Sequence, residues 1–94
     1  MKYPRIQQAQ AINPTTLVIE FTNQELKQYD ICPLLESAMF APLRQSGFFK
    51  NFTVEPGGYA IVWNEDLDIS AYELWKNGVI MERGGFAGDR ISEQ

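Results

Sequence analysis

Short rows in which apolar residues occupy every second position constrain this chain most. Leu17, Ile19 and Phe21 form the clearest row, and a period of two places their side chains on one face of a β-strand. Residues 6–12 alternate more weakly, and the Asn-Pro pair at 13–14 is typical of a turn. The first part of the chain is therefore expected to form a β-hairpin.

Two further rows extend the strand pattern. Residues 26–31 alternate, with one side formed by Lys27, Tyr29 and Ile31. The short connection before this row favours a tight hairpin, although Gln24 is not the glycine that such turns prefer. Residues 52–63 alternate on both sides of a Pro-Gly-Gly turn, which predicts a second hairpin.

Helix signals lie between and after these rows. Pro33 suits the first turn of a short helix, and Pro42 is expected to break it and to begin a second helical turn that Gly47 ends. The S-x-x-E sequence at 70–73 is a capping box, and the Asn-Gly pair at 77–78 is expected to close the helix that follows it.

These elements predict one α+β domain over residues 1–78. The expected order is β-β-β-α(-α)-β-β-α, with a small, mainly antiparallel sheet and helices packed over one of its faces. Residues 79–94 are expected to form a flexible tail that is mobile or adds a short strand at 79–82, because glycines interrupt its few apolar residues. A chain of 94 residues has room for one core only.

Several stretches at these spacings carry a family resemblance: Leu17-Val18-Ile19-Glu20-Phe21, Val54-Glu55-Pro56-Gly57-Gly58, Ile61-Val62-Trp63 and Leu74-Trp75. Over residues 3–78 the chain resembles the bacterial domain of unknown function 2442 family. The resemblance implies three strands, a helical segment, two strands and a helix. Some relatives look like antitoxins, the partners of toxin-like proteins encoded beside them, and others carry a helix-turn-helix domain. No such domain is expected within these 94 residues, so a regulatory role is expected to need a separate partner.

Histidine is absent, and its absence argues against catalysis. The chain lacks the usual general base near neutral pH, every Ser-His or Cys-His nucleophile pair and the commonest transition-metal ligand. The net charge is −4, from 8 Lys plus Arg and 12 Asp plus Glu, and the cations are scattered singly. A nucleic-acid partner is therefore disfavoured, and a basic protein partner is favoured.

The cysteine count and the hydropathy pattern indicate a compartment. Cys32 has no second cysteine with which to form an internal disulfide, and no stretch approaches the roughly 20 apolar residues that span a bilayer. The cytoplasm is therefore expected, without membrane association. Cys32 precedes Pro33 at an expected helix N-terminus, where a thiol can become reactive, but a buried and inert Cys32 is the favoured interpretation.

The densest group of charged residues follows Trp63. Glu65, Asp66 and Asp68 could bind an arginine of a partner or a divalent ion, although they lack the central Gly and terminal Glu of a calcium loop. The structural alternative is that Asp68 favours the next helix N-terminus while the other two are solvated loop charges. We take Trp63, Glu65, Asp66 and Asp68 as candidate partner-binding residues.

Four large aromatic residues are expected in the core: Tyr59, Trp63, Tyr72 and Trp75. An exposed tryptophan would instead be an interface anchor. The Gly-Gly pair at 57–58 and the Arg-Gly-Gly-Phe stretch at 83–86 resemble phosphate- or RNA-binding elements only weakly, and we interpret them as a turn and as part of the tail.

The expected function is a non-catalytic protein-interaction module, in its specific form the antitoxin-like partner of a small basic protein. The alternative is a small-molecule or metal-ion binding domain that uses the acidic loop near Trp63. No catalytic, cofactor-binding or metal-binding residue is assigned, and an enzyme of unrecognised type is disfavoured. Because an exposed edge strand of a small sheet can pair with a second copy, a homodimer is a further expectation.

Overall fold

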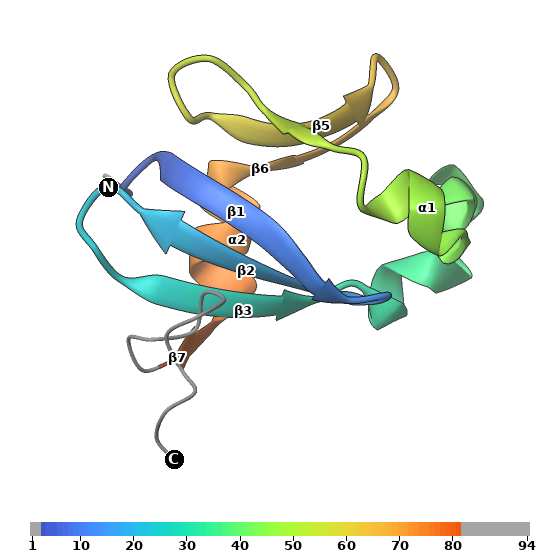
Figure 1. Cartoon of the computed structure of the whole chain (residues 1–94), viewed down its shortest axis with the longest axis horizontal. Coiled ribbons are helices and arrows are strands. Elements are labelled where there is room, and N and C mark those ends of the chain that lie inside the picture. The colour runs from blue at the N-terminus through green and yellow to red at the C-terminus, as the bar shows by residue number, and fades with distance from the viewer. Residues whose placement is uncertain (1–2, 82–94) are drawn as a thin grey trace.

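The computed structural model describes residues 3–81 and confirms the α+β class (Figure 1). Two antiparallel sheets are accompanied by short helices. The elements follow in this order: β1 (Ile6–Asn13), β2 (Thr16–Phe21), β3 (Leu26–Asp30), the 3-10 helices η1 (Cys32–Glu36) and η2 (Ala38–Arg44), α1 (Ser46–Phe49), β4 (Thr53–Val54), β5 (Ala60–Asn64), β6 (Leu67–Ser70), α2 (Ala71–Asn77) and β7 (Val79–Met81).

The strands divide into two sheets where one was expected. One sheet has the order β1-β2-β3-β7 and the other has the order β4-β5-β6, all with antiparallel pairing. The added strand is β6, in which Leu67 and Ile69 are buried while Asp68 and Ser70 are exposed. The acidic residues of this stretch favoured a loop, so its short alternating row was missed.

The face predicted for the first three strands is confirmed. Leu17 pairs with Tyr29 and Ile19 pairs with Lys27 across β2 and β3, and all four side chains are buried. The hairpin between these strands is also present. Gln24 has a φ of 74°, in the region that favours glycine, at the position where the sequence departs from a preferred turn residue.

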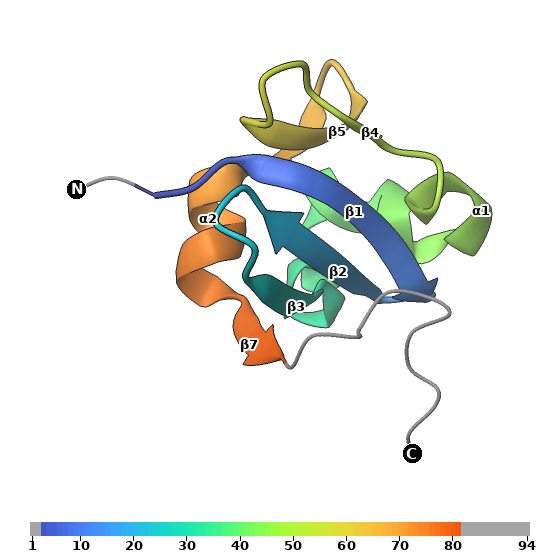
Figure 2. The same ribbon diagram turned by 60° about the vertical axis from the view of Figure 1, so that its left-hand side comes forward.

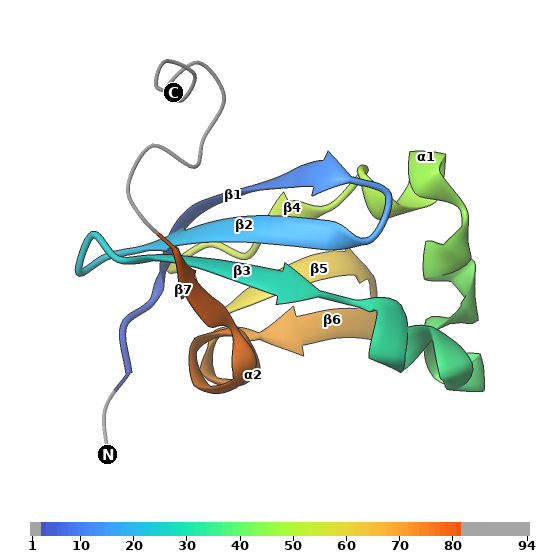
Figure 3. The same cartoon turned by 90° about the horizontal axis from the view of Figure 1, so that it is seen from below.

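The core lies between the two sheets. Figures 1 and 3 show the three-stranded sheet stacked on the four-stranded sheet, with η1, η2 and α1 at one end and α2 beside β3 and β6. Buried residues from every layer meet there: Ile6, Leu17, Ile19, Phe21, Leu43, Phe49, Ile61, Trp63, Leu67, Ile69 and Leu74. The helices therefore close the edges of a two-sheet core, whereas we expected them to cover one face of a sheet.

The helical crossover between β3 and β4 has three parts where two were expected. η1 ends at Glu36, and Ser37 is the N-cap of η2, with its Oγ accepting a hydrogen bond of 3.3 Å from Met39 N. The prediction that Pro42 begins the second helical turn is wrong: the break falls at Ser37, and Pro42 lies inside η2, because a short 3-10 helix makes few hydrogen bonds and tolerates one missing N–H. Gly47 lies inside α1, so the prediction that it ends a helix is wrong.

The predicted Pro-Gly-Gly turn joins the two sheets. Figure 2 shows the β4–β5 hairpin over the start of β1, where Ile6 N donates to Gly58 O at 2.8 Å. Gly58 has a φ of +78°, and a Cβ at this position would lie 2.4 Å from Ile6 O. Only glycine therefore allows the turn and the strand to approach this closely.

The chain continues into a short strand after α2. Val79 and Ile80 of β7 pair with Gln28 and Lys27 of β3, which matches the alternative of an added strand at this point. Both β7 side chains are exposed, at 68% and 66%. The rest of the expected tail, including the Arg-Gly-Gly-Phe stretch, lies outside the described residues.

Candidate binding groove

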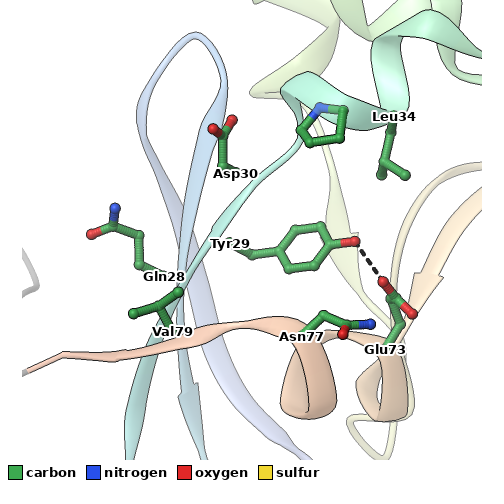
Figure 4. A pocket seen from close by; sticks show the side chains of 8 residues that line it. Gln28, Tyr29, Asp30, Leu34, Glu73, Asn77 and Val79 are labelled. Atoms are coloured by element: carbon green, nitrogen blue, oxygen red, sulfur yellow. Dashed lines mark hydrogen bonds between the residues drawn. The ribbon is translucent and has the colours of Figure 1, made fainter.

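Two adjoining cavities lie where the end of β3 meets η1, β6 and α2. The first has a volume of about 340 Å³ and is lined from β3, η1, α2 and the start of β7 (Figure 4). The second has a volume of about 420 Å³ and is lined from β3, η1, η2, β6 and α2. Tyr29, Leu34 and Glu73 line both cavities, so we treat the pair as one depression, the β3–α2 groove.

The β3–α2 groove is acidic. Asp30 and Glu73 line the first cavity, and Asp68 and Glu73 line the second. Among the described residues that line either cavity, none is Lys or Arg. Apolar walls complete the groove: Pro33, Leu34, Phe40, Ile69 and Val79. The surface therefore offers negative charge beside apolar contact area.

Glu73 is fixed by two hydrogen bonds. Its backbone N–H donates to Ser70 Oγ at 3.1 Å, which confirms the predicted N-cap of α2. The Tyr29 hydroxyl donates to Glu73 Oε2 at 2.8 Å, and Figure 4 shows the other carboxylate oxygen directed away from Tyr29. One oxygen of Glu73 is thus held by the fold, and the other can accept from a ligand.

Tyr29 is a hydrogen-bond donor over the physiological pH range. Burial raises the pKa of its phenol well above the ordinary value of 10.0, and the hydrogen bond to Glu73 and the negative charge of that carboxylate raise it further. The phenol therefore keeps its proton, and the position of the Glu73 carboxylate does not depend on pH through Tyr29.

Asp30 stands at the junction of β3 and η1. Its Oδ1 accepts a hydrogen bond of 2.9 Å from Cys32 N, and this contact orients the start of η1. Figure 4 shows Asp30 on the opposite side of the Tyr29 ring from Asn77. The first cavity therefore has one carboxylate from the end of β3 and another from α2.

The structure separates the three carboxylates that adjoin in the sequence. Asp68 lies on the exposed side of β6 and lines the second cavity with Glu73. Glu65 and Asp66 lie in the exposed turn between β5 and β6, where Asp66 N donates to Asn64 Oδ1 at 2.8 Å, and they do not line the groove. Within residues 3–81, no group of three His, Cys, Asp or Glu residues could hold a metal ion.

Trp63 is a core residue, which confirms the packing interpretation and removes it from the candidate binding surface. It is 9% exposed, its Nε1 donates to Phe49 O at 2.8 Å, and its ring stacks on that of Phe49 with 6.2 Å between centroids. Trp75 is half-buried and packs against Phe21 with 5.1 Å between centroids. Neither tryptophan presents its ring as a surface anchor.

Three residues that we expected to be buried are exposed. Cys32 is exposed at the start of η1 and does not line the groove. Tyr59 is 53% exposed beside Arg5, whose Nη1 donates to its hydroxyl at 3.1 Å, and Tyr72 is 43% exposed against the ring of Tyr3. Tyr59 immediately precedes β5 and Tyr72 lies in α2, and in each case the adjacent alanine, Ala60 or Ala71, is the buried residue.

The groove residues Tyr29, Asp30 and Glu73 were not identified as a site from the sequence. Tyr29 was correctly placed on the inner face of its strand, and Glu73 was recognised as part of the capping box. Their contact joins residues 44 positions apart, and no local pattern reports such a distance. The available signal was an acidic residue at the end of β3, Asp30, and another in the first turn of α2, Glu73.

Comparison with known proteins defines the family. Residues 6–79 match the family model described as "Protein of unknown function (DUF2442)". The chain belongs to this family. The match covers the groove and every strand except the last two residues of β7, and it confirms the resemblance seen in the sequence. No curated protein and no solved structure matches the chain. Among the described helices of this family member, none is long and apolar enough to cross a membrane.

Proposed function

We propose that this chain is a non-catalytic protein-binding module whose β3–α2 groove receives a basic segment of a partner protein. The observation that carries the proposal is the charge of the groove: Asp30, Asp68 and Glu73 line it, and no Lys or Arg does so within the described part of the chain. Such a surface repels acidic segments and attracts basic ones, so it selects a partner by charge.

The shape of the groove supports the same proposal. Cavities of about 340 and 420 Å³ lie near the lower end of the range for ligand pockets and are large enough to receive a long side chain. The apolar walls suit the aliphatic stems of Lys and Arg, which pack on apolar surface while their charged ends reach polar partners. The carboxylates of the groove supply those partners.

The specific form that we propose is the cytoplasmic, antitoxin-like partner of a small basic protein. The net charge of −4 supports association with a basic partner, since opposite charge speeds encounter. The groove also gives little support to catalysis. Ser70, its only hydroxyl besides Tyr29 in the described lining, is engaged in capping α2, and the chain has no histidine to activate it.

The alternative function is small-molecule binding. The sequence suggested the acidic loop near Trp63 as its site, but the β3–α2 groove suits a small ligand better. Trp63 is buried, and Glu65 and Asp66 project from a turn, whereas the groove contains two cavities of about 340 and 420 Å³. A small organic cation would fit the same charge and walls. A thermal shift with such a cation, together with no protein captured at the groove, would favour this alternative over the proposed function.

Affinity capture with matched variants tests the proposal. D68N/E73Q and E65Q/D66N each change the net charge from −4 to −2, but only the first pair lies in the groove. We expect the natural chain and E65Q/D66N to capture the same basic protein from the native cell, and D68N/E73Q to lose it. Equal capture by all three forms, or capture of no basic protein, would reject the proposed function.

A further inference from the structure

The second cavity of the groove combines two carboxylates with apolar and aromatic walls. Asp68 reaches it from β6 and Glu73 from the first turn of α2, while Leu34, Phe40 and Ile69 form its sides. Glu73 is half-buried, and the Tyr29 hydroxyl holds only one of its oxygens. A cation that enters this cavity therefore meets two acceptors from different elements and apolar side walls.

These features distinguish between the two basic side chains. The guanidinium of arginine is planar, carries five N–H donors and is weakly hydrated, so it can bridge two carboxylates and stack on aromatic surface. The ammonium of lysine is compact and strongly hydrated, and it loses more on leaving water for an apolar-walled site. Two carboxylates beside Phe40 therefore match the first group better than the second.

We propose that the second cavity is an arginine-selective subsite, in which the guanidinium of a partner arginine bonds to Glu73 and Asp68 and packs against Phe40. This inference rests on the proposed function and names the side chain that the groove recognises. Tyr29 acts as a positioning residue, because it holds Glu73 through Oε2 and leaves the second oxygen for the ligand. Asp30 belongs to the first cavity and is not part of this subsite.

Three short fluorescent peptides test the inference on the full chain: alternating glycine and arginine, glycine and lysine, or glycine and citrulline. Fluorescence anisotropy measures affinity, and NMR chemical shifts locate the bound peptide. We expect the arginine peptide to bind at least about tenfold more tightly than the lysine peptide, and citrulline, which is uncharged, to show no measurable binding. The largest shifts should fall at Leu34, Phe40, Asp68 and Glu73.

Charge-matched variants complete the test. We expect D68N and E73Q each to weaken arginine-peptide binding about tenfold, and E65Q and D66N to leave it unchanged. D68N alters an exposed side chain, so it tests the subsite even if E73Q does not fold. Equal affinity for the arginine and lysine peptides, no shift at the groove, or an equal effect of E65Q would overturn the inference. The capture experiment tests the proposed function separately. The proposed function requires a basic partner at the groove, whereas only the present inference requires a preference for arginine over lysine.

Discussion

The hydroxyl of Tyr29 donates a hydrogen bond of 2.8 Å to Oε2 of Glu73, and this contact ties the inner face of β3 to the first turn of α2. Both residues line both cavities of the β3–α2 groove. Tyr29 thus stabilises the fold and also orients the Glu73 carboxylate in the groove, so the same contact serves both stability and the proposed function.

Replacing Tyr29 with Phe is expected to lower the free energy of unfolding by about 1–2 kcal/mol, because the half-buried carboxylate of Glu73 loses its donor. Urea denaturation measures the change. Y72F is the matched control, since Tyr72 is 43% exposed and packs against Tyr3 and Lys76 through its ring. Equal stability of Y29F and Y72F would show that the contact contributes nothing.

The same pair predicts a dependence of stability on alkaline pH. The pKa of Tyr29 is raised in the folded chain, so its contribution is complete below the unfolded value of 10.0 and decreases as the pH rises above it. The natural chain should therefore lose more unfolding free energy than Y29F between pH 9 and about pH 11. Parallel curves for the two proteins in that range would contradict the burial of Tyr29.

Lys27 is expected to stabilise α2 from the sheet. Lys27 is only 8% exposed. Its Nζ donates to Trp75 O and lies 3.9 Å from the centroid of the Trp75 ring, so the buried cation has partners in α2. K27M keeps the stem and removes the cation, and it should cost about 1–3 kcal/mol and speed hydrogen exchange in α2. K76M serves as the control, because Lys76 is exposed and lies 5.5 Å from the Tyr72 ring centroid. A K27M protein as stable as K76M would refute this role.

Gly58 is expected to tolerate no side chain. G58A should lower the free energy of unfolding by more than about 2 kcal/mol, because its Cβ would lie 2.4 Å from Ile6 O and its φ is +78°. Gly47 lies in α1, where an added Cβ would meet no atom within 4 Å, so G47A should be neutral or stabilising by up to about 1 kcal/mol. Thermal unfolding of both variants checks the contrast, and a stable G58A would show that the turn can move away from β1.

Local patterns predicted the parts of this fold that depend on neighbouring residues. The row Leu17, Ile19 and Phe21 is fully buried, and the Ser70 cap begins α2 as expected. The strand β6 was missed because charged residues surround Leu67 and Ile69, and charge suggested a loop. Burial of these two residues in the shared core outweighs that signal, which illustrates tertiary context overriding local preference.

The candidate site was predicted only in part for a related reason. Asp68 was chosen with Glu65 and Asp66 because they adjoin in the sequence, but a strand directs its residues differently from the turn before it. In the groove, Asp68 lines the second cavity together with Glu73. The Glu73 carboxylate is in turn hydrogen-bonded by Tyr29, which lies on a strand distant in the sequence. Such a site depends on how sheets and helices pack, which spacing along the chain does not encode.

Hydrogen exchange on the chain in complex with its captured basic partner tests the central claim most directly. We expect the backbone amides of residues 28–34, apart from Pro33, and of residues 68–73, which surround the β3–α2 groove, to exchange more slowly in the complex. The amides of residues 65–66 in the β5–β6 turn should remain unchanged. Protection confined to the turn, or none at the groove, would show that the partner binds elsewhere and would contradict the account.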